Sequence, residues 1–170
     1  MDDHTPTTST PTTSTTTNLL EPRLEFAFEA RVAVDPPIRV GGPSPNEVLT
    51  FIAITGGTVA GPRVNGVILP GGGDWYTDRD GIVTLNARYL VSTHDGAFID
   101  IANRGFWRAD EGVTRRLDAG ELVNESEYYY RTSPVFTTEA DEYRWLTHTV
   151  FVGLAREEHG IICIRFFALD

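Results

Sequence analysis

The stretch ITGGTVAGPRVNGVILPGGGDWYTDRDGIVTLNAR, residues 54–88, most constrains what this chain can fold into. Its apolar runs have the length of strands, and glycine clusters separate them. Glycine lacks a Cβ, so it adopts positive φ and lets another backbone or a ligand approach closely. The Gly71–Gly73 triplet leads directly into Asp74, Trp75 and Tyr76. We therefore expect a backbone corner at the glycines, with an acid and two aromatic residues at the wall of a pocket.

Alternation of apolar and other residues predicts strands on both sides of this stretch. LEFAFEARVAV, residues 24–34, alternates with a period of two, which is typical of a half-buried strand. In IVTLNARYLVST, residues 82–93, the same period places Leu85 and Tyr89 on one face and Asn86 and Arg88 on the other. Asp-Gly pairs at 80–81 and 95–96 predict hairpin turns, and EEHG at 157–160 predicts a closing hairpin.

The whole pattern predicts an all-β domain of about eight or nine strands, because short turns join most of the segments. We expect GGTVAGP, residues 56–62, to interrupt a strand, one short helix within residues 113–123, and a helical turn at 140–146. An antiparallel meander of this kind closes into a barrel or a sandwich. At 170 residues the chain is of a size for one domain, which we place at residues 19–170.

Residues 1–18, MDDHTPTTSTPTTSTTTN, have too few apolar side chains to offset the entropy cost of ordering, so we predict a disordered tail. The segment has neither a basic nor a hydrophobic signal region, so we expect a cytoplasmic protein. Apolar runs of about 18 residues, which a membrane-spanning helix needs, do not occur in the sequence.

Charge and cysteine content limit the partners. The formal net charge is -10 and every basic residue is an arginine, which disfavours nucleic acids and anionic membranes. Cys163 is the only cysteine, so no intrachain disulfide forms, and its apolar run IICIRFF predicts a buried thiol. Apolar residues on both faces of this run suggest a covered outer surface, so we expect a homodimer.

Common catalytic and cofactor motifs are missing from the sequence. HExxH, CxxC, EF-hand and G-x-S-x-G patterns do not occur, and a chain without lysine cannot form the GxxxxGK phosphate loop. The triple glycine leads toward a strand and not toward a helix, which makes dinucleotide binding a weak hypothesis. We expect neither a metal nor a cofactor.

Four residues are candidates for catalysis. Asp74 is a candidate general acid or base, and the alternative is that it accepts backbone N–H bonds at the glycine corner. Arg88 and Arg131 are candidates for pairing with Asp74 or for stabilising a substrate oxyanion, with a structural ion pair as the alternative. His148, which we place at the start of the VFVG strand, is a candidate acid or base or an ordinary exposed histidine. Six aromatic residues are candidates for lining an apolar pocket, with plain core packing as the alternative: Trp75, Tyr76, Tyr89, Tyr128, Tyr130 and Trp145.

Five segments together resemble one family. They are TGGTVAGPRVNGVILPGGGDW, DGIVTLNARY, THDGAFIDIANRG, YYYRTSPVF, and YRWL followed by VFVG. The chain is similar to the domain of unknown function 3237 family over residues 24–169. This resemblance implies a calycin-like β-barrel, similar to lipocalin-like folds that hold small apolar molecules.

Three hypotheses for function follow from these observations. The leading one is a cofactor-independent isomerase, cyclase or lyase of secondary metabolism, acting on a small hydrophobic or aromatic molecule. In it Asp74 moves a proton while Arg88 and Arg131 stabilise negative charge. The second is a non-catalytic carrier or sensor of a hydrophobic ligand. The third is a structural protein whose barrel is filled by its own side chains, without a cavity above about 300 Å³.

Overall fold

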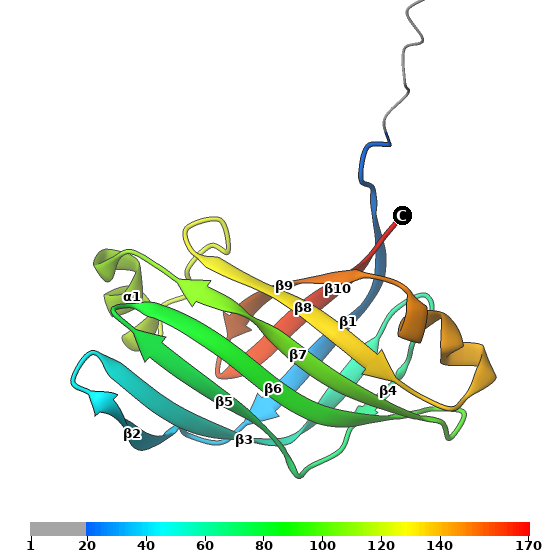
Figure 1. Cartoon of the computed structure of the whole chain (residues 1–170), viewed down its shortest axis with the longest axis horizontal. Helices are drawn as coiled ribbons and strands as arrows, with labels where there is room; N and C mark the ends of the chain where they lie inside the picture. Colours follow the sequence, from blue (N-terminus) through cyan, green and yellow to red (C-terminus); the bar gives the residue numbers. More distant parts are fainter. Residues whose placement is uncertain (1–19) are drawn as a thin grey trace, which may run out of the picture.

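The computed structural model describes residues 20–170, and ten strands of that region form one antiparallel sheet (Figure 1). The predicted tail at residues 1–18 lies outside the described region. The strands are β1 (Leu24–Val34), β2 (Ile38–Ser44), β3 (Glu47–Ala60), β4 (Gly66–Ile68), β5 (Gly72–Arg79), β6 (Ile82–Thr93), β7 (Phe98–Arg108), β8 (Tyr129–Thr137), β9 (Phe151–Glu158) and β10 (Ile161–Leu169). An α-helix, α1 (Glu111–Asp118), follows β7, and a 3₁₀ helix, η1 (Asp141–His148), follows β8.

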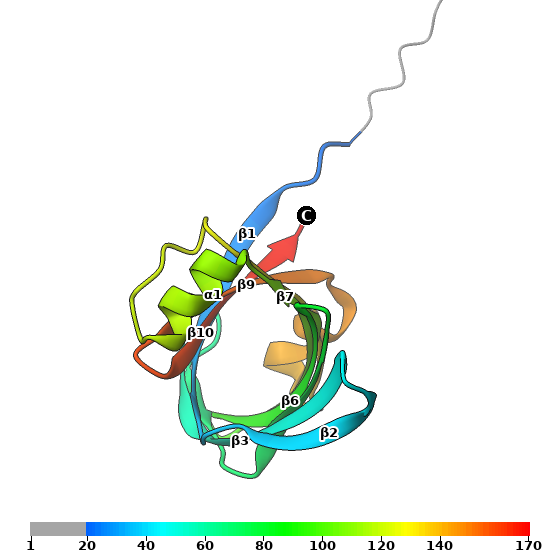
Figure 2. The same cartoon turned by 90° about the vertical axis from the view of Figure 1, so that its left-hand side faces the viewer.

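The sheet closes on itself in the order β1-β10-β9-β8-β7-β6-β5-β3, and β3 pairs back with β1. Each edge of the long strand β3 pairs with two other strands. One edge pairs with β1 over residues 54–60 and with β2 over 47–51, while the other pairs with β5 over 47–54 and with β4 over 57–59. The ring therefore has eight positions, with β2 and β4 as additional strands, and the view along its axis shows the closed barrel (Figure 2). The predicted all-β barrel is confirmed.

Both Asp-Gly pairs lie in turns as predicted, and at 95–96, between β6 and β7, the glycine has a positive φ of 90° while Asp95 does not. Asp80 and Gly81 both have positive φ, 53° and 80°, and join β5 to β6 in a tight hairpin. His159 and Gly160 repeat this geometry between β9 and β10, with φ of 51° and 78°. Positive φ at both central residues matches the twist of the flanking strands, which explains why these pairs stand at these positions.

The expectation that GGTVAGP interrupts its strand is wrong, because β3 runs unbroken through Gly56 and Gly57 to Ala60. A Cβ at Gly57 would lie 2.1 Å from the carbonyl oxygen of Arg31, so this glycine allows β1 to approach. A Cβ at Gly72 would likewise lie 2.5 Å from the carbonyl oxygen of Arg88. At these two positions the glycines bring strands close together.

The helices differ in extent from their predictions. Helix α1 ends at Asp118, earlier than the predicted 113–123, because Gly120 at φ 77° forms a glycine cap in which the N–H of Glu121 bonds the carbonyl of Arg116. His148 ends η1 and does not begin a strand, since β9 starts at Phe151. Within residues 20–170 no helix is long and apolar enough to cross a membrane.

The barrel interior is packed at one end. The rings of Phe28, Phe136, Phe151 and Phe166 contact one another at centroid distances between 4.9 and 5.8 Å. Leu146 of η1 is buried with them, so η1 covers this end. Further along β9, the alternate positions after Phe151 hold Gly153 and Ala155, which take far less volume. The closed end is therefore filled by aromatic side chains, and small residues follow toward the α1 end.

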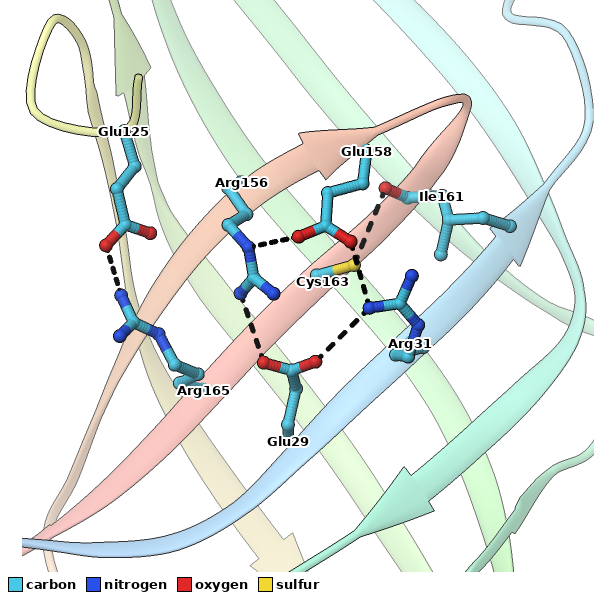
Figure 3. A network of polar contacts seen from close by, with 8 residues as sticks. All are labelled: Glu29, Arg31, Glu125, Arg156, Glu158, Ile161, Cys163 and Arg165. Atoms are coloured by element: carbon cyan, nitrogen blue, oxygen red, sulfur yellow. Dashed lines mark hydrogen bonds and ion pairs between the residues drawn. The ribbon is translucent and has the colours of Figure 1, made fainter. Parts of the chain in front are cut away.

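A ring of charged residues covers part of the outer surface (Figure 3). Glu29 and Arg31 of β1 and Arg156 and Glu158 of β9 form four ion pairs of 2.7 to 3.4 Å. Between them on β10 lies Cys163, which pairs with Arg31 and Arg156 in the sheet register and is fully buried. The thiol is buried as predicted, though beneath this ring, and burial raises its pKa to about 11.

Replacing Arg156 by alanine should destabilise the protein by about 1–3 kcal/mol, because two half-buried carboxylates would lose a shared partner. Arg115→Ala is the matched control, since its pair with Glu111 is exposed and worth about 0.5 kcal/mol or less. Urea unfolding of both variants measures the difference. Equal losses would mean that the ring adds nothing beyond a surface ion pair.

Candidate functional site

The barrel contains a cavity of about 370 Å³ at the end opposite η1. Helix α1 contributes Thr114 and Asp118 to its lining and lies at the rim of the barrel (Figure 2). The other lining residues come from the strands: Val32, Val34, Ile52, Ile54, Asp74, Tyr76, Asp78, Val83, Leu85, Ala87, Tyr89, Asn103, Trp107, Tyr130, Thr132, Glu157, Ile162 and Ile164. A cavity of this size is within the range of small-molecule sites, which starts at about 300 Å³. It counts against a barrel filled only by its own side chains.

Asp74 is a carboxyl group in this largely apolar cavity. It lies on β5 opposite Ala87, and its Oδ1 accepts a 2.9 Å hydrogen bond from the backbone N–H of Asn86. Burial raises the pKa of Asp74 to about 6, although that hydrogen bond acts in the opposite direction. A carboxyl with such a pKa is populated in both protonation states near neutrality, as a proton-transfer group requires. The predicted backbone hydrogen bond is therefore present together with the properties of an acid or base.

Three tyrosines line the cavity with Asp74: Tyr76, Tyr89 and Tyr130. Burial raises the pKa of Tyr89 and of Tyr130, and the negative charge of the Asp74 carboxylate is the second cause. Both hydroxyls therefore keep their protons and act as hydrogen-bond donors or acceptors. The Tyr89 hydroxyl is buried without a partner among residues 20–170.

Two polar residues that were not predicted from the sequence also line the cavity. Asn103 and Thr132 are buried, and their Oδ1 and Oγ1 atoms have no hydrogen-bond partner within the described part of the chain. Buried polar atoms are paired in most proteins, so unpaired ones mark a place for water or a ligand. Asn103 follows Ile99 and Ile101 at the alternate positions of β7, and this break in the apolar pattern could have identified it from the sequence.

Arg88 and Arg131 do not lie in the cavity. The Asp74–Ala87 pairing turns the next residue of β6 outward, where Arg88 is 75% exposed and bonds Asp100 at 2.9 Å. Arg131 follows the inward-facing Tyr130, and its guanidinium lies 5.5 Å from the Tyr129 ring. The proposed pairing of these arginines with Asp74 is thus wrong. Arg88 instead forms a structural ion pair with Asp100, which was the alternative.

The remaining candidates are also away from the cavity. Trp75 is half exposed on the outer face and packs on Phe51, with ring centroids 4.5 Å apart. Trp145 of η1 lies at the closed end with the Arg63 guanidinium 3.5 Å from its ring, and the exposed His148 ends the same helix. Tyr128 is buried but does not line the cavity. The cavity thus unites Asp74 with three of the six predicted aromatics.

Replacing Asp74 by asparagine should stabilise the protein at pH 8 by up to about 3 kcal/mol. The folded-state pKa is about 6, above the ordinary value of 3.8, so the folded protein binds the proton more tightly than the unfolded chain. The wild type therefore loses stability as the pH rises from about 4 to 6, and the neutral amide avoids this loss. Thermal unfolding from pH 4 to pH 8 measures it, and equal pH dependence of both proteins would contradict the prediction.

The protein is a closed antiparallel β-barrel with eight strands in its ring, and an internal cavity of the barrel contains the carboxyl group of Asp74. The family model described as protein of unknown function (DUF3237) matches residues 22–169, so the chain belongs to this family, as the sequence resemblance predicted.

Three known proteins are similar along most of their length. A UPF0311 protein of Clostridium acetobutylicum is 34% identical over 155 residues, covering 91% of this chain and 98% of that protein. The crystal structure of a conserved protein of unknown function from Rhodopseudomonas palustris matches with a TM-score of 0.82 at 29% identity, covering 89% of this chain and 99% of that chain. A hydroalkoxylation enzyme of Penicillium herquei is 27% identical over 149 residues, covering 88% of this chain and 85% of that protein.

Proposed function

We propose that this protein is a cofactor-independent enzyme that cyclises a small hydrophobic molecule by adding its hydroxyl group across its own carbon–carbon double bond. Asp74 carries the proposal, because its carboxyl lies in an apolar cavity with a pKa near neutrality. The name of the Penicillium herquei relative supports the reaction class. Such a ring closure is an isomerisation, in line with the isomerase or cyclase expected from the sequence.

The proposed step needs one proton donor that is regenerated. Protonated Asp74 gives its proton to one carbon of the double bond, forming a C–H bond. The substrate hydroxyl oxygen bonds the other carbon, and its proton returns to the Asp74 carboxylate. The π bond and the O–H bond are broken, the C–H and C–O bonds are formed, and the enzyme ends as it began. The tyrosine rings of the lining supply aromatic groups that can stabilise a positive charge developing on carbon.

The test is to incubate the protein with a series of 2-allyl and 2-prenyl phenols and to search by chromatography and mass spectrometry for a product of unchanged mass. Asp74→Asn should form product at least about 100-fold more slowly, while Asp100→Asn, which removes a carboxylate on the outer face, should react like the wild type. Equal rates for the wild type and Asp74→Asn would overturn the proposal.

A non-catalytic carrier is the second candidate, favoured by the three unpaired polar atoms of Tyr89, Asn103 and Thr132. They could hold a ligand without chemistry. Saturable binding of these phenols without any product would support the carrier over the enzyme.

A further inference from the structure

The charged groups that line the cavity are all acidic. Asp78, Asp118 and Glu157 line it together with Asp74, and none of the arginines within residues 20–170 does. The Asp78 carboxylate also accepts a 2.9 Å hydrogen bond from the N–H of Gly81, which holds it in the β5–β6 turn. Asp74 and Asp78 are partly buried, where like charges repel more strongly than in water, whereas Asp118 and Glu157 are exposed and add a weaker repulsion. A carboxylate, phosphate or sulfonate on the ligand would therefore weaken binding.

A cationic ligand conflicts with the role of Asp74 in the proposed function. A positive charge beside Asp74 would stabilise its carboxylate form. The proposed step needs the carboxyl form, which has a proton to give. Uncharged ligands are the class compatible with both the acidic lining and the proton donor.

The unpaired polar atoms indicate that the ligand carries oxygen. Asn103 is 3% exposed, and Oδ1 of its amide lacks a partner in the described chain, as does the nearly buried hydroxyl of Tyr89. An amide both donates and accepts hydrogen bonds, and a hydroxyl does the same. A hydroxyl of the ligand could donate a hydrogen bond to Oδ1 of Asn103 and could also bond the Tyr89 hydroxyl, whereas a pure hydrocarbon would leave both groups unpaired at a cost.

The sheet register relates Asn103 to the proton donor. Asp74 pairs with Ala87, and Ala87 pairs with Asn103, so the three residues form one row across β5, β6 and β7. Neighbouring strands are about 4.8 Å apart, which places the outer two backbones of the row about 10 Å apart. All three residues line the cavity, and the small Ala87 leaves room between the carboxyl and the amide.

We propose that the cavity selects uncharged molecules bearing a hydroxyl group, which donates a hydrogen bond to Asn103 across Ala87 from Asp74. This inference rests on the proposed function for its exclusion of cations. Asn103 is a specificity-determining residue in it, and Asp78, Asp118 and Glu157 act by repelling anions.

The first experiment tests charge with two fluorescent probes of the same ring skeleton, N-phenyl-1-naphthylamine and its anionic relative 1-anilinonaphthalene-8-sulfonate. At pH 8 the uncharged probe should bind at least about tenfold more tightly. The Asp118→Asn/Glu157→Gln double variant should reduce this ratio several-fold. An unchanged ratio in the double variant, tighter binding of the sulfonate by the wild type, or tighter binding of the cation 1-naphthylmethylammonium would overturn the charge selection.

Two variants locate the probe. Ala87→Leu, which adds volume inside the cavity, should weaken binding of the uncharged probe about tenfold or more. Ala102→Leu makes the same change on the outward-facing side of β7 and should leave binding unchanged. Equal binding by both variants would overturn the assignment of the cavity as the binding site.

The second experiment tests oxygen recognition with 2-naphthol and naphthalene. The wild type should prefer 2-naphthol by about tenfold, Asn103→Leu and Asn103→Ala should lose that preference, and the exposed-site control Asn46→Leu should keep it. Retained binding of the uncharged probe shows that the Asn103 variants are folded, and a retained preference for 2-naphthol in them would overturn the role of Asn103. Neither assay involves turnover. The proposed ligand class can therefore be disproved while catalysis by Asp74 stands, and catalysis by Asp74 can be disproved while the ligand class stands.

Discussion

Replacing Asp74 by asparagine should lower kcat/KM at least about 100-fold, because general acid catalysis by a positioned side chain contributes about 10²–10⁴-fold. The amide has the shape of the carboxyl, and its oxygen can still accept the hydrogen bond from the N–H of Asn86. The binding geometry should therefore survive while the transferable proton is lost. Steady-state kinetics with any phenol that the wild type cyclises measures the effect.

The pH dependence of the wild type distinguishes an acid from a base. With Asp74 as the acid, kcat/KM should be constant below pH 6, where the carboxyl is protonated, and should fall about tenfold per pH unit above it. A base would produce the opposite profile, with activity rising up to pH 6. The cavity lining favours the acid, because it holds several carboxylates and, within residues 20–170, no arginine to stabilise an oxyanion. A rate that rises through pH 6 would contradict the acid role and leave Asp74 as a base.

Replacing Phe28 by alanine should cost about 3–5 kcal/mol of unfolding free energy. Its ring is fully buried at the closed end and lies 5.0 Å from Phe166 and 5.8 Å from Phe136, so truncation leaves a void inside a packed aromatic cluster. Urea denaturation provides the free energy. Folded Phe28→Ala protein should bind ligands normally, because Phe28 does not line the cavity.

Phe26→Ala is the matched control for this prediction. Phe26 lies two residues earlier on β1, is 39% exposed and contacts the ring of Phe167, 5.7 Å away. Its loss should cost about 1.5 kcal/mol or less, because water already reaches much of the side chain. Similar costs at the two positions would show that the closed end is not the main packed core.

Together these predictions divide the barrel by function. The closed end stabilises the fold through aromatic packing, and the α1 end places a poorly solvated acid beside tyrosines and unpaired amide and hydroxyl groups. The burial that raises the pKa of Asp74 also costs folding energy at neutral pH.

Local patterns of the sequence determined much of this fold. Alternation on β6 separated Tyr89 from Arg88, and Asp-Gly turns marked the hairpins, because both depend on residues adjacent in the chain. The same alternation placed Arg88 on the face opposite Leu85 and Tyr89, but only the structure shows that this face is the outside of the barrel. On β7, the break in the apolar alternation at Asn103 was likewise readable from the sequence.

Only the tertiary structure decided which residues share the cavity. On β5 both faces carry aromatic and polar residues, so its alternation does not tell whether Asp74 or Trp75 faces inward. That choice depends on pairing with β3 and β6, between residues up to tens of positions apart. The filling of one end by four phenylalanines from β1, β8, β9 and β10, and the hollow left at the other, also arise from contacts across the closed barrel. The sequence alone determined most of the strands and which of their residues share a face, because these follow from local periodicity. The face that lines the cavity, and with it the site, depends on long-range register and packing.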